Sequence, residues 1–279
     1  MWRILQIVVV VMSGGLTLAS AEDRLKIVVS IPPQRWLVEQ IGGDRVDVKV
    51  LVAPGESPTT YQPTDAQVTH LLQAKIYFRI GVPFERGLWF EALGKMARLE
   101  RIDVRAGIEL QGDDPHIWLS PRLLSIQAAT VAASLSRHDP TERDFYAANL
   151  NRLETRMEAL DEEIRQMLEP FAGRSFFVFH PSWGYFSAAY GLEQIAVEKD
   201  GREPSDWELT VLQRQARKAG ITTVFVQPQI YGRGAQAFAE SIGAELQTLD
   251  PLVADVAVNL AETADKLKAS FSERETRGQ

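Results

Sequence analysis

Two histidines and one aspartate stand next to prolines at points where predicted strands or loops end. His180 follows the short apolar run 175–179, which predicts a buried parallel strand. Asp250 ends a second strand-like run, and His116 lies in a loop bracketed by prolines. Because ligands of open α/β sheets bind at the carboxyl ends of strands, these side chains from distant segments predict a metal site.

Each of these residues also has an ordinary structural interpretation. His180 could be a hydrogen-bonded core histidine, His116 could stabilise its own loop, and Asp250 could be the N-cap of the next helix. Trp118 and Trp183, which stand near the two histidines in the sequence, could line a cleft or belong to the core. The sequence alone therefore leaves two interpretations open at every one of these positions.

The donor types favour one class of metal. Two imidazoles and one carboxylate suit zinc or another late first-row dication, whereas magnesium and calcium prefer sites made only of oxygen. Metal binds the deprotonated imidazole, so acid should release it. The other two histidines are expected to be structural, because His70 falls in a helical pattern and His138 precedes a predicted helix junction.

The composition of the 279-residue chain excludes several classes of protein. Hydrophobic residues make up 45% and charged residues 24%, which is typical of a globular protein large enough for two lobes. The formal net charge is −7 and no strong basic patch stands out, so we expect no nucleic-acid partner. The chain has no cysteine, which excludes disulfides, thiolate ligands and a lipid-modified cysteine.

Residues 1–21 have the pattern of a secretory signal peptide. Arg3 supplies the positive charge, residues 4–12 form a short apolar run, and Ala19-Ser20-Ala21 is a small-x-small cleavage site. The apolar run is shorter than the roughly 20 residues of a membrane-spanning helix. We therefore expect a soluble, periplasmic and monomeric protein.

Hydrophobic periodicity predicts an α/β fold of two βα lobes with parallel sheets, joined by one long helix. Because the candidate ligands come from both lobes, the metal site is expected in the cleft between the lobes. The expected domains are a signal peptide (1–21), an N-terminal lobe (22–139), a linker helix (140–169) and a C-terminal lobe (170–279). The expected strands are 25–31, 46–52, 76–80, 99–104, 175–179, 194–198, 223–227 and 245–249.

Several helix boundaries can also be predicted. Thr64 and Gln67 have the spacing of a capping box at the start of a helix. Pro181 favours a helix over 181–190 with the proline in its first turn. Residues 272–279 are polar, and we expect them to be frayed.

The linker helix is predicted from apolar residues repeated at spacings of four and three, namely Leu153, Met157, Leu160, Ile164 and Met167. About 30 helical residues would span roughly 45 Å, enough to cross between two lobes. The alternative is a long surface helix on a single domain.

The motifs of the chain resemble those of the periplasmic metal-binding proteins of zinc and manganese ABC importers, over nearly all of the sequence after the signal peptide. The resemblance is carried by Val52-Ala53-Pro54-Gly55-Glu56-Ser57-Pro58, Asp114-Pro115-His116-Ile117-Trp118-Leu119-Ser120-Pro121, His180-Pro181, Tyr190-Gly191, Gln227-Pro228-Gln229 and Leu249-Asp250-Pro251-Leu252. It implies a binding protein that delivers zinc, or alternatively manganese, to an ABC-type permease.

The resemblance also implies the ligands. His116, His180 and Asp250 match the second, third and fourth metal ligands of the family, and a histidine at the third position resembles the zinc branch. Thr59 occupies the position of the family's first ligand histidine. A hydroxyl is a poor zinc ligand, so Thr59, a water molecule or a displaced Glu56 could complete the site.

Two other functions remain open from the sequence. A zinc hydrolase could use the open coordination position, but the chain has no His-Glu-x-x-His motif to supply a general base. The loss of the first histidine would also suit a binding protein repurposed for a metal chelate, another ligand or a partner protein. We expect a transport protein and not an enzyme.

Overall fold

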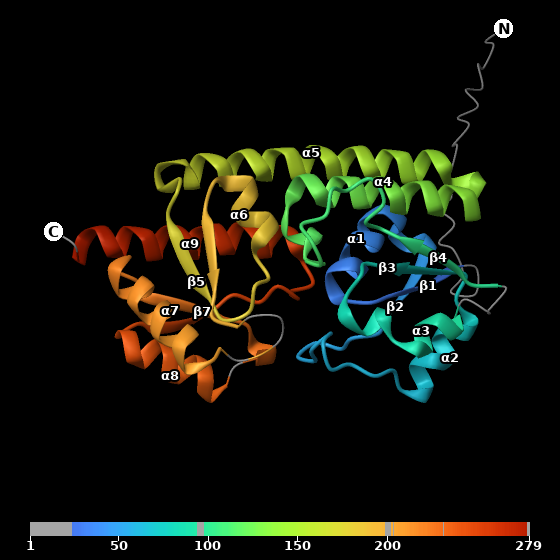
Figure 1. The fold of residues 1–279 in the computed structure, drawn as a ribbon. Coiled ribbons are helices and arrows are strands. Elements are labelled where there is room, and N and C mark those ends of the chain that lie inside the picture. The colour runs from blue at the N-terminus through green and yellow to red at the C-terminus, as the bar shows by residue number, and fades with distance from the viewer. Residues whose placement is uncertain (1–23, 94–97, 199–201, 203, 231, 278–279) are drawn as a thin grey trace, which may run out of the picture.

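The computed structural model describes residues 24–93, 98–198, 202, 204–230 and 232–277. The predicted signal peptide, 1–21, lies outside the described residues. The described chain forms two lobes, each built around a four-stranded parallel sheet (Figure 1). Within the described residues, no helix is both long and apolar enough to cross a membrane.

The N-terminal lobe contains a sheet with the strand order β2-β1-β3-β4. Its strands are β1 (Leu25–Val29), β2 (Val46–Val50), β3 (Ile76–Arg79) and β4 (Glu100–Asp103). Its helices are α1 (Pro32–Gly42), α2 (Asp65–Gln73), α3 (Leu88–Leu93) and α4 (Pro121–His138). The predicted capping box is confirmed at the start of α2, where the Gln67 amide nitrogen donates to Thr64 Oγ1 and the Thr64 amide donates to Gln67 Oε1.

The C-terminal lobe repeats this arrangement, with the strand order β6-β5-β7-β8. Its strands are β5 (Ser175–Val178), β6 (Glu193–Ala196), β7 (Thr223–Val226) and β8 (Glu245–Thr248). Its helices are α6 (Gly184–Tyr190), α7 (Asp206–Lys218), α8 (Arg233–Ile242) and α9 (Val256–Arg277). All strand pairs in both sheets are parallel, so the carboxyl ends of each set of strands meet at one edge.

One long helix, α5 (Arg143–Leu168), runs across both lobes (Figure 1). Its 26 residues correspond to about 39 Å at 1.5 Å per residue. It packs against α1 and α4 of the N-terminal lobe and against α6 and α9 of the C-terminal lobe. Leu153, Met157, Leu160 and Ile164 form its buried stripe as predicted, but Leu168, not Met167, completes it.

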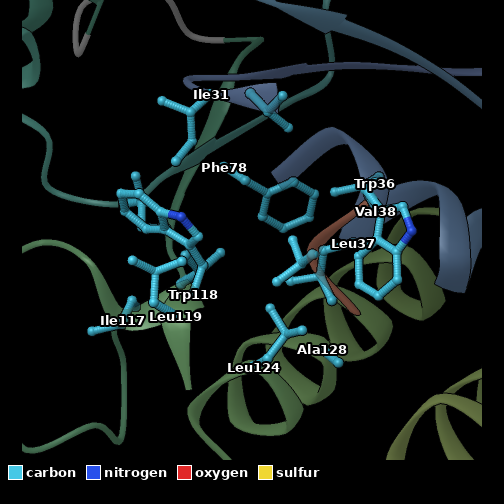
Figure 2. Packing of buried hydrophobic residues seen from close by; sticks show 14 of the residues in the cluster. Ile31, Trp36, Leu37, Val38, Phe78, Ile117, Trp118, Leu119, Leu124 and Ala128 are labelled. Carbon is cyan, nitrogen blue, oxygen red and sulfur yellow. The ribbon is translucent and has the colours of Figure 1, made fainter. Parts of the chain in front are cut away.

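A single apolar core passes from one lobe into the other. It includes sheet residues of both lobes together with buried side chains of α4, α5 and α9. Figure 2 shows part of it, where Trp118 and Leu119 pack with Phe78, Leu124 and other N-terminal side chains. A second, smaller cluster lies in the C-terminal lobe, where sheet residues such as Phe177 pack against Phe238 of α8.

The carboxyl ends of β1 and β3 are filled by a structural network. Glu85 is buried and accepts hydrogen bonds from the amides of Ile80 and Gly81 and from the Ser30 hydroxyl, which also contacts the Tyr77 hydroxyl. Burial raises the pKa of Glu85. These groups therefore satisfy one another's hydrogen bonds at this edge of the sheet.

All eight predicted strands are present, with ends within two residues of those expected. Two helix predictions are wrong. Helix α6 begins at Gly184, not in the turn of Pro181, because the Ser182 amide donates to His180 O and the Trp183 amide to Gln194 Oε1. The end of the chain is not frayed from residue 272, because α9 continues to Arg277 and Arg274 Nη1 donates to Ser175 O.

Candidate metal centre

The loop that carries His116 connects β4 to α4 and is fixed on both sides. On one side, the Asp114 carboxylate accepts hydrogen bonds from the backbone amide of His116 at 2.9 Å and from its Nδ1 at 2.6 Å. On the other side, Ile117, Trp118 and Leu119 are buried in the core. His116 therefore stands on a short, well-anchored turn, and its side chain is 13% exposed.

His180 follows strand β5 by two residues. The register of the sheet pairs Val178 with Ala196 of β6, so His180 is level with Glu198. The Glu198 carboxylate is buried and lies 3.2 Å from His180 Nδ1. The parallel pairing of β5 and β6 thus provides this histidine with a carboxylate partner.

The two histidines, one from each lobe, come together. Their ring centroids are 5.6 Å apart, and the ring planes are inclined at 73°. His116 also lies 5.1 Å from the ring of Trp118. The structure therefore brings together two of the three candidate ligands that are far apart in the sequence.

Direct hydrogen bonds link the lobes beside this histidine pair. The Tyr185 hydroxyl, from α6, accepts from the Gln111 amide and donates to Asp114 O, at 2.9 and 3.1 Å. Trp118 Nε1 donates to Pro251 O at 2.7 Å. A Cβ atom on Gly184 would lie 2.8 Å from Asp114 Oδ2, so any larger residue at the start of α6 would force this carboxylate to shift.

Asp250 lies at the end of β8, in the same sheet edge as His180. Its Oδ1 accepts hydrogen bonds from Gln229 Nε2 at 3.0 Å and from the Leu252 amide at 2.9 Å. It does not cap the next helix, since α9 begins at Val256 and Asp255 Oδ1 accepts from the Val258 amide. The N-cap interpretation of Asp250 is therefore wrong.

The complete ligand set is not assembled in this structure. Among the described residues, no group of three or more histidine, cysteine, aspartate or glutamate side chains is placed to hold a metal ion. The rings of His116 and His180 lie together. The Asp250 carboxylate instead accepts hydrogen bonds from Gln229 and from the Leu252 amide. The structure therefore shows the two histidines together but does not show Asp250 as a member of the same group.

Thr59 is an exposed residue in the loop after β2. Its backbone amide donates to Ser57 Oγ at 3.3 Å. Glu56 is also exposed, and its carboxylate accepts from the Ala53 amide within the same loop. Neither side chain has a recorded contact with the histidine pair.

The electrostatic environment favours neutral imidazole at His116. Burial, the largest influence, lowers the pKa of His116; the Asp114 carboxylate raises it by less, and His180 adds to the lowering. An ionised carboxylate can only accept a hydrogen bond, so the bonded Nδ1 atoms of both histidines carry the proton. Nε2 of each ring is then the atom with a free lone pair, which is what a metal ligand requires.

Of the other residues singled out in the sequence, the two tryptophans and His138 make structural contacts, and within the described residues no contact of the His70 side chain supports the structural role expected for it. Trp118 and Trp183 are buried in the core, although Trp118 also contacts His116. His138 ends α4, and its Nε2 lies 2.5 Å from Glu100. His70 is exposed on α2.

Sequence reasoning missed the partners of the candidate ligands, namely Asp114, Glu198, Gln229 and Tyr185. Asp114 could have been found, because a carboxylate two residues before a loop histidine can accept from its backbone amide. Glu198 and Gln229 have no local signal, since they become neighbours of His180 and Asp250 only through the strand order of the sheet.

The comparisons with known proteins agree on one family. The family model described as zinc-uptake complex component A, periplasmic, matches residues 27–266. The chain is 28% identical to the high-affinity zinc uptake system protein ZnuA of Paracoccus denitrificans, over 76% of this chain and 78% of that protein. It is 27% identical to the manganese ABC transporter substrate-binding lipoprotein PsaA of Streptococcus pneumoniae, over 91% and 93%.

Solved structures give the same result. A crystal structure of ZnuA superposes with a TM-score of 0.84 at 43% identity, covering 89% of this chain and 99% of that one. A zinc-bound deletion mutant of ZnuA superposes equally well at 42% identity, covering 89% and 98%. Both cover the two lobes and the long helix, so the expected fold class is confirmed.

Proposed function

The chain belongs to the family of the periplasmic component A of zinc-uptake complexes, and on that premise we propose that it captures a divalent metal ion, zinc before other dications, and delivers it to an ABC-type permease. Members of this family are substrate-binding transport proteins and not enzymes. The relatives named for zinc and for manganese leave the metal itself to be determined.

The observation that carries this proposal is the histidine pair between the lobes. Two imidazoles from different lobes lie 5.6 Å apart, and each has its Nδ1 held by a carboxylate. Carboxylate–histidine pairs of this kind are usual around metal ions, because the carboxylate fixes the tautomer and makes the imidazole more basic. An ordinary core histidine would not need a second imidazole at that distance.

The donor set supports zinc as the cargo. His116 and His180 would bind through Nε2, and Asp250 would add a carboxylate oxygen. With Thr59 as a weak fourth donor or replaced by water, the site would have three protein ligands and one open position. Such a site would bind zinc less tightly than a site with three imidazoles.

The domain division and the location follow from the same proposal. Residues 1–21 would direct export, 22–139 and 170–279 would form the two lobes, and 140–169 would form the linker helix. A soluble monomer in the periplasm would then carry the metal to its permease. The chain has no cysteine that could carry a lipid anchor after the signal peptide.

Elemental analysis of the protein purified without chelators tests the proposal. We expect close to one equivalent of zinc, and re-binding of zinc by the metal-free protein with micromolar affinity or better in a competition titration. Manganese, measured in parallel, should bind more weakly. Absence of any bound first-row metal, together with no binding of any dication by the metal-free protein, would contradict the proposal.

A second candidate is supported by the exposed hydroxyl of Thr59 at the first ligand position. With one coordination position open, the site could take a metal already held by a small chelator. A native mass spectrum of the purified protein distinguishes the two. A mass increase equal to one metal ion supports the first candidate, and a larger increase from an organic ligand supports the second.

A further inference from the structure

Three polar side chains that touch the candidate ligands are not themselves candidate ligands. Asp114 contacts His116, Glu198 contacts His180, and Gln229 contacts Asp250. We propose that these three are positioning residues, each of which turns one ligand so that its coordinating atom faces the cation. The inference rests on the proposed metal-binding function.

Asp114 is the best supported of the three. One oxygen, Oδ1, accepts from both the backbone amide and Nδ1 of His116, at 2.9 and 2.6 Å. Both the loop and the ring are therefore fixed by the same atom. The Asp114 carbonyl in turn accepts from Tyr185 of the other lobe, so the orientation of this ring depends on how the lobes are joined.

Glu198 has the same role for His180 but reaches it from a neighbouring strand. The Glu198 amide donates to Phe179 O at 2.8 Å, which extends the β5–β6 pairing beyond the strands and keeps the carboxylate level with the ring. Its side chain is 9% exposed, so water competes little for the 3.2 Å contact with Nδ1. The buried carboxylate therefore selects the tautomer with the lone pair on Nε2.

Gln229 holds the third ligand. Its Nε2 donates to Asp250 Oδ1, the atom that also accepts from the Leu252 amide. Within the described residues, Gln229 Oε1 is buried without a hydrogen-bond partner, so the contact with Asp250 determines how this amide is oriented. Both bonds go to Oδ1, which leaves Oδ2 of Asp250 available to the cation.

The first test measures zinc affinity by competition with a chromophoric chelator. We expect Asp114→Ala and Glu198→Ala to weaken binding by about 10- to 100-fold, the usual effect of removing such a partner. Asp114→Asn and Glu198→Gln keep a carbonyl oxygen that can accept from Nδ1, so they should recover most of the loss. Gln229→Ala should give a smaller loss than either.

Two exposed residues close to the positioning residues in the sequence serve as controls. Asp113→Ala removes the neighbouring carboxylate, which is 92% exposed and lies 3.4 Å from Arg86. Gln236→Ala removes an exposed glutamine of α8. Both should change zinc affinity by less than twofold, and the melting temperatures of all metal-free variants would report any loss of folding.

The second test reads the tautomers, which a purely structural role would not change. The chain has only four histidines, so nitrogen-15 NMR of the metal-free protein can resolve each ring. We expect His116 and His180 to carry the proton on Nδ1 in the wild type. Asp114→Ala should release His116 alone and Glu198→Ala should release His180 alone, with His70 and His138 unchanged.

The outcomes separate this inference from the proposed function. If the wild type binds zinc, but the alanine variants bind it within twofold and keep their tautomers, the positioning inference is overturned and the function stands. If the wild type binds no dication while the tautomers change as described, the metal function is overturned, and the hydrogen-bonded orientation of the rings stands.

Discussion

The loops that carry His116 and Thr59 belong to the same lobe but are held in different ways. The His116 loop is bound by Asp114 within the loop, by the core at Trp118 and by Tyr185 from the other lobe. Near Thr59, the recorded bonds stay within the loop, such as Thr60 N to Ser57 O at 3.2 Å. The first loop is fixed by distant parts of the chain, whereas the hydrogen bonds around Thr59 lie within its own turns.

This difference bears on Thr59, which stands where the family resemblance implies a first ligand histidine. The Thr59 loop is anchored where it ends, because Tyr61 packs on the Phe84 ring and donates to Gln67 Oε1. Residues 53–60, which precede Tyr61, are exposed or half-buried, so they can change without removing a buried contact. A substitution on this loop should therefore disturb the fold less than one at His116 or His180, which lie where the lobes meet.

The largest effect in the comparison between the Thr59 loop and the histidine pair should come from removing a histidine of the pair. His180→Ala removes one imidazole of the pair, and zinc binding should weaken by more than about 100-fold, a larger loss than that of a positioning partner. The measurement is a competition titration against a chelator. His70→Ala, which removes an exposed histidine of α2, is the control. A loss of less than threefold for His180→Ala would mean that it is not a ligand.

The next largest effect on zinc affinity should come from a substitution at Thr59. Thr59→His introduces the imidazole that the resemblance implies at this position, and in the proposed site it would complete a tetrahedron. We expect zinc binding to tighten by about 10- to 100-fold in the same titration. An unchanged affinity would show that the loop does not reach the cation and that the cleft differs from that of its relatives.

A change in stability is expected where helix α5 contacts α6 of the C-terminal lobe. The Asp161 carboxylate of α5 accepts hydrogen bonds from Arg122, Arg165 and the hydroxyl of Tyr190, the last residue of α6. Asp161→Asn should lower the free energy of unfolding by about 1–2 kcal/mol, measured by urea denaturation. Glu158→Gln, at an exposed position of α5, is the control.

The pH dependence of this effect has a definite sign. Burial would raise the pKa of Asp161, but the hydrogen bonds from Arg165, Arg122 and Tyr190 outweigh it and the pKa is lowered. The stabilisation is therefore complete above the unfolded pKa of about 3.9 and is lost as the pH falls through the folded value. The difference between wild type and Asp161→Asn should shrink below about pH 4. A constant difference down to pH 2 would contradict this assignment.

The smallest effect should be that of Thr59→Ala. Because the side chain is exposed, its removal should change zinc affinity by less than twofold and leave the melting temperature unchanged. A loss of tenfold or more would identify the Thr59 hydroxyl as a ligand after all.

The sequence predicted the strands well where a short apolar run lies between turn residues, as in β1 and β5. It also placed His116 and His180 at loops after strands, where the structure has them. It could not predict the start of α6, because Trp183 donates its amide to Gln194, a residue of another strand. Nor could it predict that Glu198 faces His180, since this depends on β6 lying beside β5.

The apolar core shared by the two lobes has a mechanical consequence. Swinging the lobes apart as rigid bodies would expose side chains such as Trp118, Trp183 and Leu260 to water, at about 25 cal/mol for every Å² of apolar surface. Shifts of surface loops would expose less of this core, so we expect any opening to involve loops and not the lobes as wholes. On heating, both halves should then melt in one endotherm, and a scanning calorimeter would record a single peak.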